Sequence, residues 1–118
     1  MKYVFLTCLL LPVLSFGQVG AKAQTPGRRI EIVARRYSFA PAEITVRRNE
    51  AVTLALTSQD VTHSLLIPGL HINATASKGR VTEVTVTPDK VGDFPGRCGR
   101  FCGSGHGSML FVVHVTNK

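Results

Sequence analysis

Apolar and polar residues alternate along much of the chain after residue 30, which is the pattern of half-buried strands. The alternation is clearest over residues 30–35, 43–47 and 51–57. Side chains of a strand point in turn to opposite faces, so each segment predicts one face in a core and one in solvent. Further strands are expected over residues 61–67, 81–87, 92–97 and 109–116.

Turn residues separate these segments at roughly ten-residue spacing. Pro41 cannot lie in a central strand, so 37–41 is expected to be a bend or crossing, and 70–79 an irregular run after Pro68 and Gly69. No segment shows a sustained helical period, and the chain has no internal repeat. The pattern predicts an all-β protein, an antiparallel β-sandwich.

The strand expected at the C-terminal end also predicts which side chains are buried. Met109, Phe111, Val113 and Val115 have the same parity and are expected to face inward. Met109 would then lie at the end of the core. His114 has the opposite parity and is expected at the surface rather than at a ligand position.

The N-terminal segment is typical of a secretory signal peptide. A lysine precedes an apolar run over residues 4–14, and small residues follow up to Ala23. We expect residues 1–23 to be removed, 24–29 to form a flexible lead-in and 30–118 to form the domain. No apolar run is long enough for a permanent membrane span, so we expect an exported, periplasmic protein.

The charge balance bears on the choice of partner. The formal net charge is +7, and six arginines crowd the first half of the domain: Arg28, Arg29, Arg35, Arg36, Arg47 and Arg48. A positive surface favours encounter with acidic proteins, so redox partners with acidic surfaces are expected. Nucleic acid is not an expected partner, because the chain is exported and has no basic helix. A simpler interpretation is that the arginines only solvate strand edges.

Four metal-ligand residue types lie within twelve positions: Cys98, Cys102, His106 and Met109. Thiolate, thioether and imidazole donors select copper or zinc, and methionine favours copper. Glycines at 99, 103, 105 and 107 would let the loop turn tightly around an ion. A disulfide between the two cysteines is the alternative, although it would close too small a loop to stabilise the fold much.

His63 provides a second imidazole for this cluster. It lies in the apolar stretch 61–67, where a buried imidazole needs a partner. His63, Cys102, His106 and Met109 would suffice for a mononuclear blue-copper site. Cys98 is then surplus, and two bridging thiolates would instead allow two copper ions to share one electron hole.

From Asp60 to Met109 the chain resembles the CuA-binding cupredoxin domain of cytochrome c oxidase subunit II, which is similar to the CuA domain of nitrous oxide reductase. The resemblance rests on Cys-x3-Cys-x3-His-x2-Met with an upstream histidine, and on shorter matches at 60–64, 68–70, 79–80 and 92–98. It implies a cupredoxin-like Greek-key fold.

The resemblance also implies a ligand set for two copper ions. Cys98 and Cys102 would bridge them, and His63 and His106 would bind one copper each. Met109 and the backbone carbonyl of Arg100 would be the weak ligands.

The chain departs from the oxidase pattern in three respects. Oxidase subunits usually carry a magnesium-binding glutamate where Arg100 stands, and arginine cannot ligate a cation. The chain has no tryptophan, and no counterpart of the family's two transmembrane helices is expected. Its positive charge would repel a basic cytochrome c. His71 is expected in a loop beside the site.

The leading hypothesis is an exported electron carrier with a binuclear CuA centre that catalyses nothing alone. The alternatives are a copper-delivery or storage module, and a detached subunit of a cytochrome oxidase or nitrous oxide reductase. A zinc-bound or disulfide-stapled sandwich is the remaining possibility.

Overall fold

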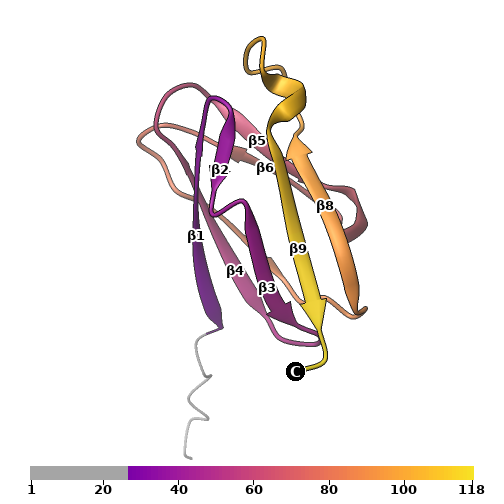
Figure 1. Ribbon diagram of the computed structural model, residues 1–118. Helices are drawn as coiled ribbons and strands as arrows, with labels where there is room; N and C mark the ends of the chain where they lie inside the picture. The colour runs from indigo at the N-terminus through magenta and orange to yellow at the C-terminus, as the bar shows by residue number, and fades with distance from the viewer. Residues whose placement is uncertain (1–26) are drawn as a thin grey trace, which may run out of the picture.

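The computed structural model describes residues 27–118, which form a sandwich of two β-sheets (Figure 1). The expected signal peptide lies outside the described residues. One sheet has the strand order β2-β1-β4-β7, and the other has the order β3-β9-β8-β5-β6. The strands are β1 (Arg28–Arg35), β2 (Ser38–Ala40), β3 (Glu43–Arg47), β4 (Val52–Ser58), β5 (His63–Ile67), β6 (Ile72–Ala76), β7 (Thr82–Val86), β8 (Gly92–Cys98) and β9 (Leu110–Thr116).

The core lies between the sheets and is built by the alternation seen in the sequence. β3 has the burial pattern exposed–buried–exposed–buried–exposed, with Ile44 and Val46 inward. β4 is more continuously buried. Met109, Phe111, Val113 and Val115 are each no more than 3% exposed, so the inward face predicted for the last strand is confirmed.

The all-β, cupredoxin-like sandwich is therefore confirmed, but the strand pairing is not antiparallel throughout. β1 pairs with β4 in parallel, and β3 pairs with β9 in parallel. The other pairings between named strands of the described chain are antiparallel. Parallel neighbours need a crossover between sheets, which alternation within one strand cannot reveal.

Two segments expected to lack regular structure contain strands. β2 lies where a bend was predicted, next to Pro41, and pairs with β1. β6 lies inside the run 70–79 and pairs with β5 along its whole length. Its burial alternates, but Asn73 and Thr75 on its polar face obscured the pattern. In addition, β1 begins at Arg28, within the lead-in expected over 24–29.

Two short 3₁₀ helices complete the described chain: η1 (Pro68–Leu70) and η2 (His106–Ser108). No helix within residues 27–118 is long and apolar enough to cross a membrane. The segment between β8 and β9 carries η2 and lies at one end of the sandwich, beside the β1–β2 connection, whereas the C-terminus lies at the other end (Figure 1). The predicted metal-ligand loop therefore lies at one end of the sandwich.

Candidate metal centre

Two strand ends fix the base of the cluster. Cys98 is the last residue of β8, and Met109 directly precedes β9. The Cys98 amide donates a hydrogen bond to the Met109 carbonyl oxygen at 3.1 Å. Both side chains point into the end of the core, at 1% and 0% exposure. The antiparallel β8–β9 pair therefore holds the two residues at a fixed separation.

The two cysteines lie in direct contact as free thiols. Their Sγ atoms are 3.2 Å apart, and Cys98 also donates to the Arg100 carbonyl oxygen at 3.1 Å. Burial and the hydrogen bond with Cys98 raise the pKa of the Cys102 thiol to about 11. The Cys102 thiol is therefore protonated at neutral pH, and a metal that binds it must displace a proton.

His63 enters the cluster from β5, which pairs with β8 in the same sheet. One donor atom each of His63, Cys98 and Cys102 lie within 4.8 Å of one another, and all three residues are buried. His63 Nε2 lies 2.7 Å from Asp60 Oδ1, while Nδ1 has no hydrogen-bond partner. Within residues 27–118, His63 Nδ1 is the only buried side-chain nitrogen or oxygen atom without a hydrogen-bond partner. Such an atom is costly unless something binds it.

Asp60 orients this imidazole from the β4–β5 connection. Its carboxylate accepts hydrogen bonds from the backbone amides of Arg36 and Val61 at 2.8 and 2.6 Å. The Arg36 amide and then His63 hold the pKa of Asp60 well below its usual range. A carboxylate on the outer nitrogen of a ligating histidine fixes the ring and its tautomer. Asp60 belongs to the segment 60–64 that carries part of the family resemblance, but the sequence did not indicate that it orients His63.

The remaining predicted donors reach the cluster through Cys102. Cys102 Sγ lies 3.7 Å from His106 Nδ1 and 3.8 Å from Met109 Sδ. His106 is half-buried on η2, and Phe101 packs near it, with ring centroids 6.0 Å apart. The structure thus brings all six predicted residues to one place. Their roles as ligands stay a prediction.

Tyr37 explains two of the loop glycines. A Cβ on Gly103 or Gly105 would lie 2.4 Å from a Tyr37 ring or hydroxyl atom. The glycines give close approach to an aromatic side chain, and only Gly103 in the loop also has positive φ, at 136°. The close approach of Tyr37, rather than a tight turn around an ion, therefore explains glycine at positions 103 and 105. The contact joins residues more than sixty positions apart, so nothing in the local sequence pointed to it.

His71 was expected beside this site and does not lie there. It is exposed after η1 and borders a hollow with residues of the β7–β8 connection, Pro88, Asp89 and Lys90. His114 lies half-exposed on the outer face of β9, as its parity predicted, and hydrogen-bonds to Asp93.

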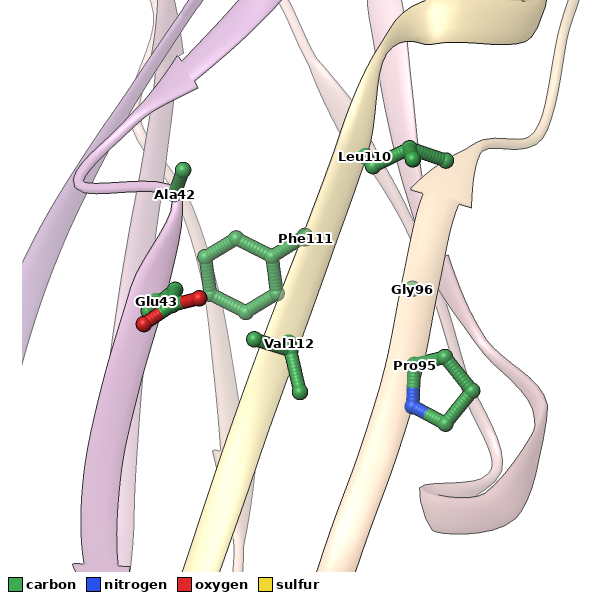
Figure 2. A pocket seen from close by; sticks show the side chains of 7 residues that line it. All are labelled: Ala42, Glu43, Pro95, Gly96, Leu110, Phe111 and Val112. Carbon is green, nitrogen blue, oxygen red and sulfur yellow. The ribbon is translucent and has the colours of Figure 1, made fainter.

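An apolar hollow of about 370 Å³ lies outside the cluster, on the outer face of β3, β9 and β8 (Figure 2). Leu110, which is 61% exposed, projects at its edge. Its lining contains one carboxylate, Glu43, and no thiol or imidazole. The hollow therefore provides no second site for a soft metal ion.

The fold and the cluster together define the class: a cupredoxin-type β-sandwich with thiol, thioether and imidazole donors gathered at one end. The chain belongs to the family of cytochrome c oxidase subunit II periplasmic domains, whose model matches residues 25–116.

Individual relatives agree with this assignment. A protein of Rickettsia prowazekii described as "Probable cytochrome c oxidase subunit 2" is 30% identical over 91 residues, which are 77% of this chain and 29% of that protein. The chain thus spans less than a third of that relative.

Solved structures show the same fold. The periplasmic domain of cytochrome oxidase subunit II from Bradyrhizobium japonicum matches with a TM-score of 0.71 at 20% identity, over 77% of this chain and 85% of that one. A chain of a heme-copper terminal oxidase dimer matches with a TM-score of 0.69 at 28% identity, over 91% of this chain and 76% of that one.

Proposed function

We propose that this protein is a copper-binding electron carrier with a binuclear CuA centre. The observation that carries the proposal is the unpaired Nδ1 of His63, buried beside two free thiols that touch each other. Imidazole and thiolate are donors that copper prefers, so the residues present fit the metal that the family implies.

The proposed ligands are the six residues named from the sequence. Cys98 and Cys102 would bridge two copper ions, with His63 on one and His106 on the other. Met109 and the Arg100 carbonyl would be the weak ligands. The carbonyl already lies within hydrogen-bond distance of Cys98 Sγ, which supports a backbone donor at this position.

A copper pair held in this way would supply reversible one-electron chemistry. The protein's contribution is to keep the donors in place and water away from them. Cys98, Met109 and His63 are at most 1% exposed, so their environment has a low dielectric constant. Asp60 keeps the His63 ring oriented, and the Gly99 amide donates to Ser64 Oγ at 3.0 Å, tying the loop to β5.

We further propose that the carrier works outside the cytoplasm, with redox proteins as partners. The family model describes a periplasmic domain, which supports this location. Arg100 stands at the expected magnesium-ligand position, and a guanidinium has no lone pair to offer a cation. We therefore infer that the protein lacks the magnesium contact expected in an oxidase.

A second candidate is a subunit of an oxidase assembly, which the match to a chain of a heme-copper terminal oxidase dimer favours. It requires the same copper centre but a stable partner complex. Purification of the native protein under mild conditions distinguishes the two: a carrier elutes alone, whereas a subunit elutes with haem-containing chains.

The test of the copper centre is metal analysis with optical and electron-spin spectra of the loaded protein. We expect two copper ions per chain, a purple colour and a spin spectrum of one hole shared by two copper nuclei. Cys98→Ser should lower the stoichiometry and abolish that spectrum. His71→Asn removes an exposed imidazole remote from the cluster and tolerates the positive φ at that position, so it should leave both unchanged.

A blue product with one copper ion would overturn the binuclear assignment. Retention of two copper ions in Cys98→Ser would do the same, because a single thiolate cannot provide two bridges.

A further inference from the structure

A second hollow lies beside the proposed copper centre, at Cys102. Its volume is about 320 Å³, and it opens beside Cys102. Its lining residues are Arg36, Val61, Thr62, Arg100, Phe101, Cys102 and Gly103. Every charged side chain among them is an arginine, and both arginines are exposed. The nearest surface to a cluster thiol is therefore positively charged.

The neighbouring carboxylate of Asp60 offsets only one of the two arginine charges, so a net positive charge remains. Asp60 accepts hydrogen bonds from the Arg36 and Val61 amides and interacts with His63 Nε2, so its oxygens are engaged within the site. Arg36 is also held in place, because its Nε donates to the Cys102 carbonyl oxygen at 3.2 Å. The Arg100 guanidinium has no hydrogen bond or ion pair within residues 27–118, where only the backbone carbonyl of Arg100 accepts one, and it remains available to a partner.

Phe101 lines the same hollow as the two arginines. It is the most exposed of the large hydrophobic residues within residues 27–118, at 79%. Its ring is tilted by 40° to His106, with centroids 6.0 Å apart. An exposed aromatic ring beside arginines is typical of the centre of a protein interface, where burial of the ring contributes much of the affinity.

We propose that Arg36, Arg100 and Phe101 form the docking surface for an electron-transfer protein whose own redox centre is surrounded by carboxylates. The proposal rests on the electron-carrier function proposed above. The partner's carboxylates would meet the two arginines, and an apolar group would cover Phe101. This arrangement brings the partner's redox centre closest to Cys102 and His106. A small anion alone would leave the aromatic ring exposed, so the surface fits a protein better.

The charge part of the proposal is tested by electron exchange with two inorganic oxidants of opposite charge. Reduced, copper-loaded protein is mixed with ferricyanide or with tris(phenanthroline)cobalt(III), and the oxidation is followed by stopped flow. In each case one electron leaves the copper centre and reduces the metal complex. The two oxidants carry charges of opposite sign, so a change of surface charge should affect their rates in opposite directions.

Arg100→Glu should slow oxidation by ferricyanide about tenfold at low salt and accelerate oxidation by the cobalt complex. Both changes should disappear at high salt, where charges are screened within a few ångströms. Arg48→Glu makes the same change of net charge in the turn after β3, beside the C-terminal end of β9 and away from the cluster. It should alter neither rate more than about twofold. Equal effects of the two variants would overturn the proposed location.

The aromatic part is tested with protein probes, a small acidic ferredoxin and a basic cytochrome c, by titration calorimetry at low salt. We expect the ferredoxin to bind and the cytochrome not to bind. Phe101→Ser should weaken ferredoxin binding at least about fivefold while leaving the ferricyanide rate within about twofold. Leu110→Ser removes a comparably exposed apolar side chain on the β9 face and should leave binding unchanged.

The titrations are made on metal-free as well as copper-loaded protein, so they separate two kinds of failure. Absence of copper binding with retained ferredoxin binding would overturn the proposed function but keep the docking surface. Normal copper and ferricyanide chemistry with no ferredoxin binding, or with binding indifferent to Phe101→Ser and Arg100→Glu, would overturn the docking surface.

Discussion

Two histidines of this protein pair with an aspartate at almost the same distance, 2.7 Å for His63 with Asp60 and 2.6 Å for His114 with Asp93, yet their surroundings differ completely. The His63 side chain is 0% exposed and its second nitrogen has no partner. The His114 side chain is 34% exposed, and its second nitrogen faces Glu43 at 3.7 Å.

The comparison shows that a histidine–aspartate pair by itself indicates little about function. At the outer face of β9 both ring nitrogens have carboxylate neighbours and the surface is solvated, so the pair is an ordinary ion pair. In the core the aspartate occupies one nitrogen and burial denies water to the other. The second nitrogen therefore has no partner and lies beside two buried thiols, which supports the proposed copper site.

The largest expected difference between the two regions is in metal binding. His63→Gln should weaken copper binding at least as much as the roughly 10–100-fold loss typical when only an outer partner of a ligand is removed. His114→Gln should bind copper like the unaltered protein. Competition with a copper chelator measures both affinities, and circular dichroism confirms that each variant is folded. Equal copper affinities of the two variants would show that His63 is not a copper ligand.

The next largest effect is the loss of unfolding free energy when the aspartate of each pair, Asp60 or Asp93, is replaced. Asp60→Asn should lower the free energy of unfolding of the metal-free protein by about 2 kcal/mol, because hydrogen bonds from two backbone amides and an imidazole lose their charged acceptor. Asp93→Asn acts on an exposed pair and should have a clearly smaller effect. Denaturant titration measures both. A larger loss in Asp93→Asn would contradict the comparison.

A third prediction concerns the side of the cluster that carries His106. Gly105→Ala should cost about 1–2 kcal/mol of unfolding free energy, because its Cβ would lie 2.4 Å from the half-buried Tyr37 ring, which must shift. Gly107→Ala meets nothing within 4 Å and should be nearly neutral. The cost of Gly105→Ala should fall in a Tyr37→Ala background. If it persists there, Tyr37 is not the cause.

The smallest expected effect is the pH dependence of the exposed pair. The hydrogen bond with Asp93, followed by the charges of Asp93 and Glu43, raises the pKa of His114 above its ordinary value of 6.5. A raised pKa means that protonated His114 stabilises the folded state below pH 6.5 and that this contribution is lost as pH rises through the folded pKa. Asp93→Asn should flatten this part of the stability profile, measured by thermal melts across pH 5 to 8. An unchanged profile would contradict the assignment.

Much of the fold could be predicted from the sequence because burial in β-strands leaves a period of two. The inward face of β9 and the surface position of His114 followed from parity alone. β2 and β6 were missed, since the first has three residues and the second carries polar residues on one face. The parallel pairings could not be foreseen, because they depend on which strands cross between sheets.

For the candidate site, the sequence by itself determined which candidate donors occur together: Cys98, Cys102, His106 and Met109 are close along the chain, and their spacing predicts a soft-metal site. Only the tertiary structure decided what surrounds them. Asp60 on His63, Tyr37 against the loop glycines, and Arg36 with Arg100 over Cys102 are contacts between distant segments. The physical reason is that donor chemistry resides in individual side chains, whereas orientation, burial and surface charge arise only when the folded sheets bring separate loops to one end of the sandwich.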